Sequence, residues 1–177
     1  MPDGWPPEPQ PWPVVPRPFL EEPIGGWLGR VAARYRMSVG ELVALHGLDL
    51  GGEHATDAWL LISAVSHATI RRLGALARVE PELLQQMLPQ RLRHGERGRL
   101  RYCARCLFLN PTDVMSPRWL RTWLDDGMHS CDLHGTPLRG LTLSAMRGCR
   151  NFDALLRQVS RLERTQDCYS GRRETQR

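Results

Sequence analysis

Three cysteines and one histidine occur in two closely spaced pairs, and this spacing indicates a metal site. Cys103 and Cys106 form a Cys-x-x-Cys pair, and Cys131 and His134 form a Cys-x-x-His pair farther along the chain. Two residues between the members of a pair let one tight turn direct both donors at the same ion. Three thiolates and one imidazole suit one structural Zn²⁺ ion and leave no position for a catalytic water. The alternative, unrelated buried cysteines beside a surface histidine, does not account for the paired spacing.

Catalytic chemistry is not expected from the other reactive side chains. Cys149 and Cys168 have no partner at ligand spacing, so we interpret them as ordinary thiols. His129 lacks the paired histidine, asparagine or acidic residues of a metal-dependent nuclease, and no strand-rich region could hold the carboxylate triad of a transposase. We therefore expect no enzyme, no catalytic residue and no small-molecule substrate.

Length and composition indicate a cytoplasmic protein. The 177 residues can form one ordinary domain, or two small ones, with a real hydrophobic core. The first residues show no signal-peptide pattern, and the longest apolar run, residues 58–65, is too short to cross a bilayer. In the cytoplasm, paired cysteines hold metals more often than they form disulfides. We expect no contact with a membrane.

The formal net charge is +5, and all of the Lys+Arg content is arginine. Gly95 and Gly98 predict a turn, and Leu100 and Tyr102 predict a short strand that enters the metal site. The guanidinium group suits phosphates and carboxylates, so this basic hairpin is expected to contact nucleic acid or an acidic partner. The alternatives are a solvated hairpin and the arginine codons of a GC-rich genome. The arginines of this cluster are Arg91, Arg93, Arg97, Arg99, Arg101 and Arg105.

Apolar periodicity predicts helices before this cluster, at residues 24–35, 38–47, 57–65, 67–78 and 81–88. Ser38 and Glu41 form a predicted capping box, and Pro81 suits a first helical turn. Two of the helical pairs resemble each other at a spacing of 42 residues, for example Arg36 against Arg78. Each pair fits a helix-turn-helix, in which Gln85 or Gln86 could read adenine, although a plain helical bundle needs the same apolar positions.

Residues 1–22 are rich in proline and are expected to be extended and poorly packed. Trp5, Trp12 and Phe19 lie between the prolines and are interpreted as anchors of an arm that docks on a partner. The alternative is a flexible leader without a partner.

The predicted fold is mainly α. It comprises the proline-rich arm (1–22), a helix-turn-helix-like helical domain (23–90), a small zinc-ribbon or zinc-finger module with the basic hairpin (91–142), and a basic helix with a disordered tail (143–177). Inside the finger, Ser116 and Pro117 predict a helix that carries Trp119 and Trp123. The tail is expected to be disordered from Asp167.

Two stretches together resemble the TniQ (TnsD/TniQ) family of transposition proteins. Residues 16–32 are similar to the family's opening, with a proline-containing arm, acidic residues and a Trp-Leu-x-Arg helix. Residues 101–107, Trp123 and residues 131–138 are similar to its finger pattern R-x-C-P-x-C-L … W … C-x-x-H-G-x-x-L, with Ala104 in place of the usual proline. The resemblance spans roughly residues 13–140.

The resemblance implies a non-catalytic adaptor that helps to choose the insertion site, with the Cys3His set as zinc ligands. Such an adaptor recruits the transposon's AAA+ ATPase (TnsC-like), which in turn recruits the transposase. Because no second ligand set follows, the chain is similar to the short family members, including those of CRISPR-associated transposons. There the adaptor links an RNA-guided effector complex, with its guide RNA and target DNA, to the ATPase. The alternative is a stand-alone helix-turn-helix or zinc-finger regulator that binds DNA sequence-specifically.

Overall fold

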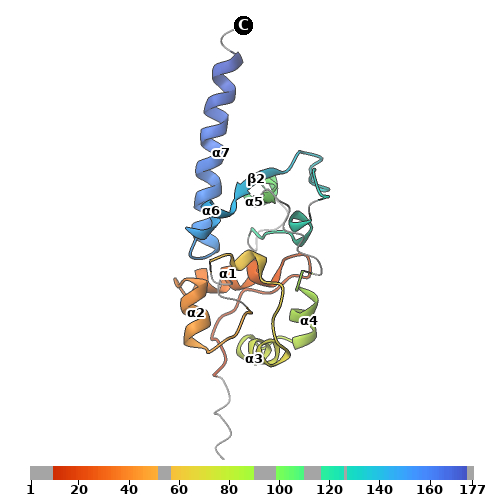
Figure 1. Cartoon of the computed structure of the whole chain (residues 1–177), viewed down its shortest axis with the longest axis vertical. Helices are drawn as coiled ribbons and strands as arrows, with labels where there is room; N and C mark the ends of the chain where they lie inside the picture. The colour runs from red at the N-terminus through yellow and green to blue at the C-terminus, as the bar shows by residue number, and fades with distance from the viewer. Residues whose placement is uncertain (1–9, 52–56, 90–98, 110–116, 126, 175–177) are drawn as a thin grey trace, which may run out of the picture.

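The computed structural model describes residues 10–51, 57–89, 99–109, 117–125 and 127–174, with side chains described as far as residue 165. The described chain is mainly helical (Figure 1). One half of the molecule contains α1 (Ile24–Arg34), α2 (Val39–Leu45), the 3-10 helix η1 (Trp59–Leu61), α3 (His67–Ala77) and α4 (Pro81–Gln86). The other half contains β1 (Arg99–Tyr102), α5 (Ala104–Phe108), the 3-10 helix η2 (Arg121–Leu124), β2 (Arg139–Thr142), α6 (Leu143–Arg147) and α7 (Phe152–Glu174).

Helix α1 packs against η1, α2 and α7, and every residue from Ile24 to Ala32 is buried. Two glycines allow η1 to pack directly on this helix. A Cβ atom on Gly25 would lie 1.7 Å from the carbonyl oxygen of Trp59, and one on Gly29 would lie 2.5 Å from the Trp59 ring. Glycines four residues apart therefore form the face of α1 on which η1 rests.

The two helical pairs share the same backbone turn. Arg36 and Arg78 both adopt left-handed backbone conformations, with φ of 58° and 54°. In each turn the next residue is apolar and its N–H bonds to a carbonyl five residues earlier: Met37 to Ala32 at 2.9 Å, and Val79 to Gly74 at 3.0 Å. This is the Schellman pattern of a helix end. The predicted 42-residue similarity is therefore present in the backbone.

Local signals placed two helix starts correctly. The Ser38 hydroxyl accepts the Glu41 N–H at 3.0 Å, and the Glu41 carboxylate accepts the Ser38 N–H at 2.6 Å, which completes the predicted capping box of α2. Pro81 is the first residue of α4, as predicted.

The strands β1 and β2 form a two-stranded antiparallel sheet in which Leu100 pairs with Leu141, and both leucines are buried. Helix α7 is tied to this sheet by one carboxylate. Glu163 accepts a hydrogen bond from the Tyr102 hydroxyl at 2.8 Å and forms an ion pair with Arg139. The predicted strand before the first cysteine pair is confirmed, and its partner strand lies beyond the second pair.

Three predictions of local structure are contradicted. The helix expected over residues 57–65 is reduced to η1: the backbone leaves the helical conformation at Ile62, with ψ of 116°, and Trp59 packs against the glycine face of α1. The helix expected from Pro117 is reduced to η2, because Leu120 is extended. Helix α7 continues to Glu174, although disorder was expected from Asp167; no proline interrupts residues 152–174.

The described part of the proline-rich arm contains no helix or strand, and the expectation of poor packing is wrong. The Trp12 backbone N–H bonds to the Leu76 carbonyl at 2.7 Å, and its indole Nε1–H donates to His46 Nε2 at 2.8 Å. The Trp12 side chain is only 5% exposed and lies against Trp27 at a centroid separation of 6.4 Å. Trp12 therefore anchors the arm to the protein's own core, while Trp5 lies outside the described residues.

One hydrophobic cluster passes through both halves, from Trp12 to Val159. The turn after α1 and the start of α7 connect them. Val39 N–H bonds to the Arg150 carbonyl at 2.8 Å, and the Asn151 amide donates to the Met37 carbonyl at 2.7 Å. Within the described ranges, no helix combines the length and apolar character needed to span a bilayer.

Candidate metal centre

All four predicted ligands lie together at one end of the small sheet, where β1 ends and β2 begins. Cys103 follows β1 and precedes α5, and Cys106 lies within α5, so the first pair is placed by the junction of a strand and a helix. The second pair lies in a tight turn, where the Cys131 carbonyl accepts the N–H groups of His134 at 3.3 Å and Gly135 at 2.7 Å. Gly135 has φ of +61°, a left-handed conformation that glycine adopts without strain.

Four of the six separations between donor atoms are close to those of a tetrahedral site. Cys106 Sγ lies 3.5 Å from Cys131 Sγ and 3.2 Å from His134 Nδ1. His134 Nδ1 lies 3.6 Å from the sulfur atoms of both Cys103 and Cys131, and all four donors fall within 4.8 Å of one another. A tetrahedron with metal–sulfur distances of about 2.3 Å and a metal–nitrogen distance of about 2.0 Å has edges of about 3.5–3.8 Å. The four residues could therefore hold one metal ion.

The electrostatics of the site also fit a cation. Burial raises the pKa of the Cys106 thiol, and the neighbouring Cys131 and Cys103 thiols raise it further. Burial has the same effect on Cys103, but hydrogen bonds from the Cys106 N–H and the Thr136 hydroxyl outweigh it, so the pKa of Cys103 is lowered. A cation stabilises all three thiolates together, because it opposes both the burial and the mutual repulsion of the sulfur atoms.

The tryptophans in the segment between the two ligand pairs pack beside the sheet. Trp119 is fully buried; its ring lies 5.8 Å from that of Tyr102 and meets the Trp123 ring edge-on at 5.7 Å. Arg101 donates a hydrogen bond to the Met128 carbonyl and so connects β1 to the segment just before Cys131. Three of the four donors are buried and His134 is half-buried, beside this packed aromatic module.

Of the predicted contact residues, the structure describes Arg99, Arg101, Arg105, Gln85 and Gln86, and these five lie in different environments. Arg99 and Arg105 are exposed, whereas Arg101 is half-buried and is used within the module. Arg91, Arg93 and Arg97 lie outside the described residues, so the rest of the predicted basic hairpin does too. Gln85 and Gln86 are exposed on α4, in the other half of the molecule.

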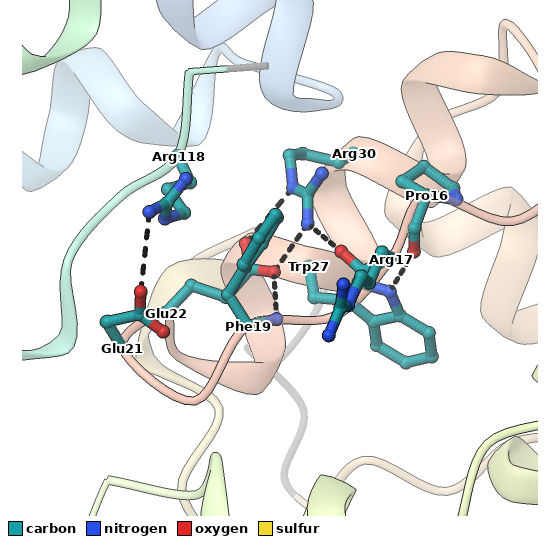
Figure 2. A network of polar contacts seen from close by, with 8 residues as sticks. All are labelled: Pro16, Arg17, Phe19, Glu21, Glu22, Trp27, Arg30 and Arg118. Carbon is teal, nitrogen blue, oxygen red and sulfur yellow. Dashed lines mark hydrogen bonds and ion pairs between the residues drawn. The ribbon is translucent and has the colours of Figure 1, made fainter. Parts of the chain in front are cut away.

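The sequence prediction missed a buried polar network that joins the arm to α1 (Figure 2). Glu22 is fully buried and forms an ion pair with Arg30, with Arg30 Nε at 3.0 Å and a terminal nitrogen at 2.5 Å from the two carboxylate oxygens. Arg30 also donates to the Arg17 carbonyl at 2.7 Å. The signal in the sequence was the pair of glutamates before the Trp-Leu-x-Arg helix, of which Glu22 lies eight residues before the arginine.

Phe19 extends this network to the metal-binding half. Its ring lies between two guanidinium groups, with Arg30 at 5.4 Å and Arg118 at 4.2 Å from the ring centre. Arg118 also pairs with the exposed Glu21 at 3.3 Å, and the Arg121 N–H bonds to the Glu21 carbonyl at 2.6 Å. Phe19, expected to be a partner anchor, therefore packs between segments of its own chain.

Comparison with known proteins covers both halves of the molecule. The TniQ family model matches residues 13–138, which include most of the described arm, both helical pairs and all four candidate metal ligands. No curated protein matches the sequence. Because the family model covers more than half of the chain, the protein belongs to the TniQ family of transposition-associated proteins.

Proposed function

We propose that the metal site holds one structural Zn²⁺ ion. The proposal is supported by the Cys3His donor set, whose donor atoms lie within 4.8 Å of one another, and by the burial of three of the four residues. With all four positions filled by protein ligands, the ion supplies folding energy and fixes the module without activating a water. The role assigned to it is to hold β1, α5 and the second ligand turn in one arrangement.

The function we propose is that of a non-catalytic transposition adaptor. It links a target-DNA complex, or an RNA-guided CRISPR effector complex with its guide RNA, to the transposon's AAA+ ATPase, which recruits the transposase. The observation that carries this proposal is the family match across the arm, the helical pairs and the metal site together. The shared core and the Phe19 contacts support it, because they give an adaptor two surfaces held rigidly with respect to each other. We also propose a cytoplasmic location, since reduced thiols in a metal site suit that compartment.

The test is a pull-down of the AAA+ ATPase encoded beside this protein, with and without nucleotide and target DNA. The zinc-loaded full chain should retain the ATPase. Reversing two exposed charges near the metal site, Arg99→Glu with Arg105→Glu, should weaken association with nucleic acid and flatten its salt dependence. Arg71→Glu on α3 is the matched control, because Arg71 is also exposed but lies in the other half. Failure to retain the ATPase in every condition would count against the adaptor.

A stand-alone sequence-specific regulator has less support from the site. The helix that carries Gln85 and Gln86 has six residues, and Glu82 lies on its first turn. No arginine or lysine occurs within α4 to contact phosphates beside the glutamines. Tight binding of one palindromic duplex by the isolated protein would restore this reading.

A further inference from the structure

A hollow of about 330 Å³ lies between the end of α5 and the middle of α7. Its apolar part is formed by Phe108 and Leu156, and Phe108 is 42% exposed to solvent. Leu109, the next residue along the chain, is 67% exposed. Exposed large apolar side chains gathered at one place on a surface commonly mark a site of interaction.

Three arginines border this hollow. Arg157, Arg161 and Arg164 are spaced four and three residues apart along α7, so they lie on one face of the helix, and all three are exposed. In the part of the chain with described side chains, no carboxylate forms an ion pair with any of them. Glu163 is engaged elsewhere, by Arg139 and the Tyr102 hydroxyl, so it does not neutralise this face.

The apolar side chains of the hollow and the arginines beside it together determine which kind of ligand can bind. Guanidinium groups pair with carboxylates through two parallel hydrogen bonds. The apolar surface of Phe108 and Leu156 favours contact with an apolar side chain of the ligand. Nucleic acid fits less well, because stacking of bases needs aromatic platforms and, among the described lining residues, Phe108 alone is aromatic. A peptide with an apolar residue flanked by acidic residues uses both parts of the surface.

We propose that this surface, formed by Phe108, Leu156, Arg157, Ser160, Arg161 and Arg164, docks an acidic peptide segment with a central apolar anchor. The apolar anchor occupies the hollow, and the flanking carboxylates pair with the arginines of α7. The segment belongs to a protein of the transposition machinery; in this one respect the inference rests on the proposed function. The peptide experiment below needs no such protein, so its outcome is separate from that of the ATPase pull-down.

The test measures fluorescence anisotropy of labelled synthetic probes with the zinc-loaded full chain. The first probe is a short peptide of Glu and Asp around a central Leu-Phe, and the second has Ser-Ser in place of Leu-Phe. An oligo-dT strand of equal charge is the third. The first peptide should bind most tightly, and binding should weaken by about tenfold in Arg157→Glu/Arg161→Glu, because two weak ion pairs become repulsions.

Phe108→Ser should weaken binding of the Leu-Phe peptide and leave binding of the Ser-Ser peptide unchanged. Charge attraction alone does not produce this difference. Arg71→Glu on α3 is the control and should bind the peptide as the unaltered protein does. Circular dichroism and zinc content confirm that each variant is folded. Equal binding by both peptides overturns the apolar anchor, and tighter binding of the oligonucleotide assigns the surface to nucleic acid instead. Absence of binding by every probe also overturns the proposal.

Discussion

Arg30→Met is expected to destabilise the protein by about 3–5 kcal/mol, because it leaves a buried carboxylate without its cation. The Glu22 side chain is 0% exposed and that of Arg30 is 5% exposed, so water cannot replace the lost partner. After the substitution, the Phe19 N–H, at 3.1 Å from Glu22 Oε1, remains as a donor to the carboxylate. Methionine fills a similar volume, so the change tests the charge more than the packing.

The penalty should depend on pH in a defined direction. Burial raises the pKa of Glu22 above the ordinary value of 4.5, and Arg30 opposes this effect. Without Arg30 the pKa in the folded state rises further, so the folded protein binds this proton more tightly than the unfolded chain does. Stability lost at neutral pH is therefore recovered as pH falls through the folded pKa toward 4.5.

Urea unfolding followed by circular dichroism, in metal-replete buffer at about pH 7 and about pH 5, measures both effects. Glu21→Gln is the matched control: this neighbouring carboxylate is 55% exposed in its pair with Arg118, and its loss should cost about 1 kcal/mol or less. The double variant Glu22→Leu/Arg30→Met should recover most of the lost stability, because no charge stays buried. A cost for Arg30→Met equal to that of Glu21→Gln, and equal at both pH values, would refute the reasoning.

Three other predictions concern the metal, the helix core and the arm. Cys106→Ser should release the ion and unfold the module around it, since structural zinc supplies on the order of 10 kcal/mol of folding free energy. The control Cys149→Ala should keep its full metal content. Equal metal content in both variants, measured by mass spectrometry, would contradict the ligand assignment. Gly25→Ala should cost about 3 kcal/mol or more of stability in thermal unfolding, because its Cβ would overlap the backbone of η1. Gly26→Ala should instead stabilise α1 by about 0.5–1 kcal/mol, because its Cβ would lie 3.4 Å from the nearest atom, in the Pro23 ring. Burial lowers the pKa of His46 below 6.5, so the stability that its neutral form contributes to arm docking should be present above pH 6.5 and be lost as pH falls from 6.5 through the folded pKa. His46→Gln should remove that slope from a series of melting temperatures, and an unchanged slope would show that another group titrates.

The predictions that the structure confirmed rest on short-range geometry. The two residues between Cys103 and Cys106 already limit how far apart their sulfur atoms can lie, whatever surrounds them. Ser38 with Glu41 in a capping box, and Pro81 at the start of α4, likewise act within one helical turn. For such features the neighbouring residues supply most of the relevant free energy.

Tertiary packing decided the features that the sequence pattern misjudged. The run around Trp59 and Leu60 is apolar on all sides because η1 is buried beneath α1, and such a run carries no period that separates helix from turn. The role of Trp12 also depended on distant residues, since its indole N–H donates to His46 Nε2 and its backbone N–H donates to the Leu76 carbonyl.

By itself, the sequence determined the donor set, the strand beside it, the main helix starts and the resemblance to the TniQ family. Only the tertiary structure decided that Glu22 and Arg30 form a buried pair, and that Phe19 lies between Arg30 and Arg118. The physical reason is that a ligand pair or a cap is formed by residues within a few positions of each other. A buried charge or an aromatic anchor is stable only where segments far apart in the chain exclude water together.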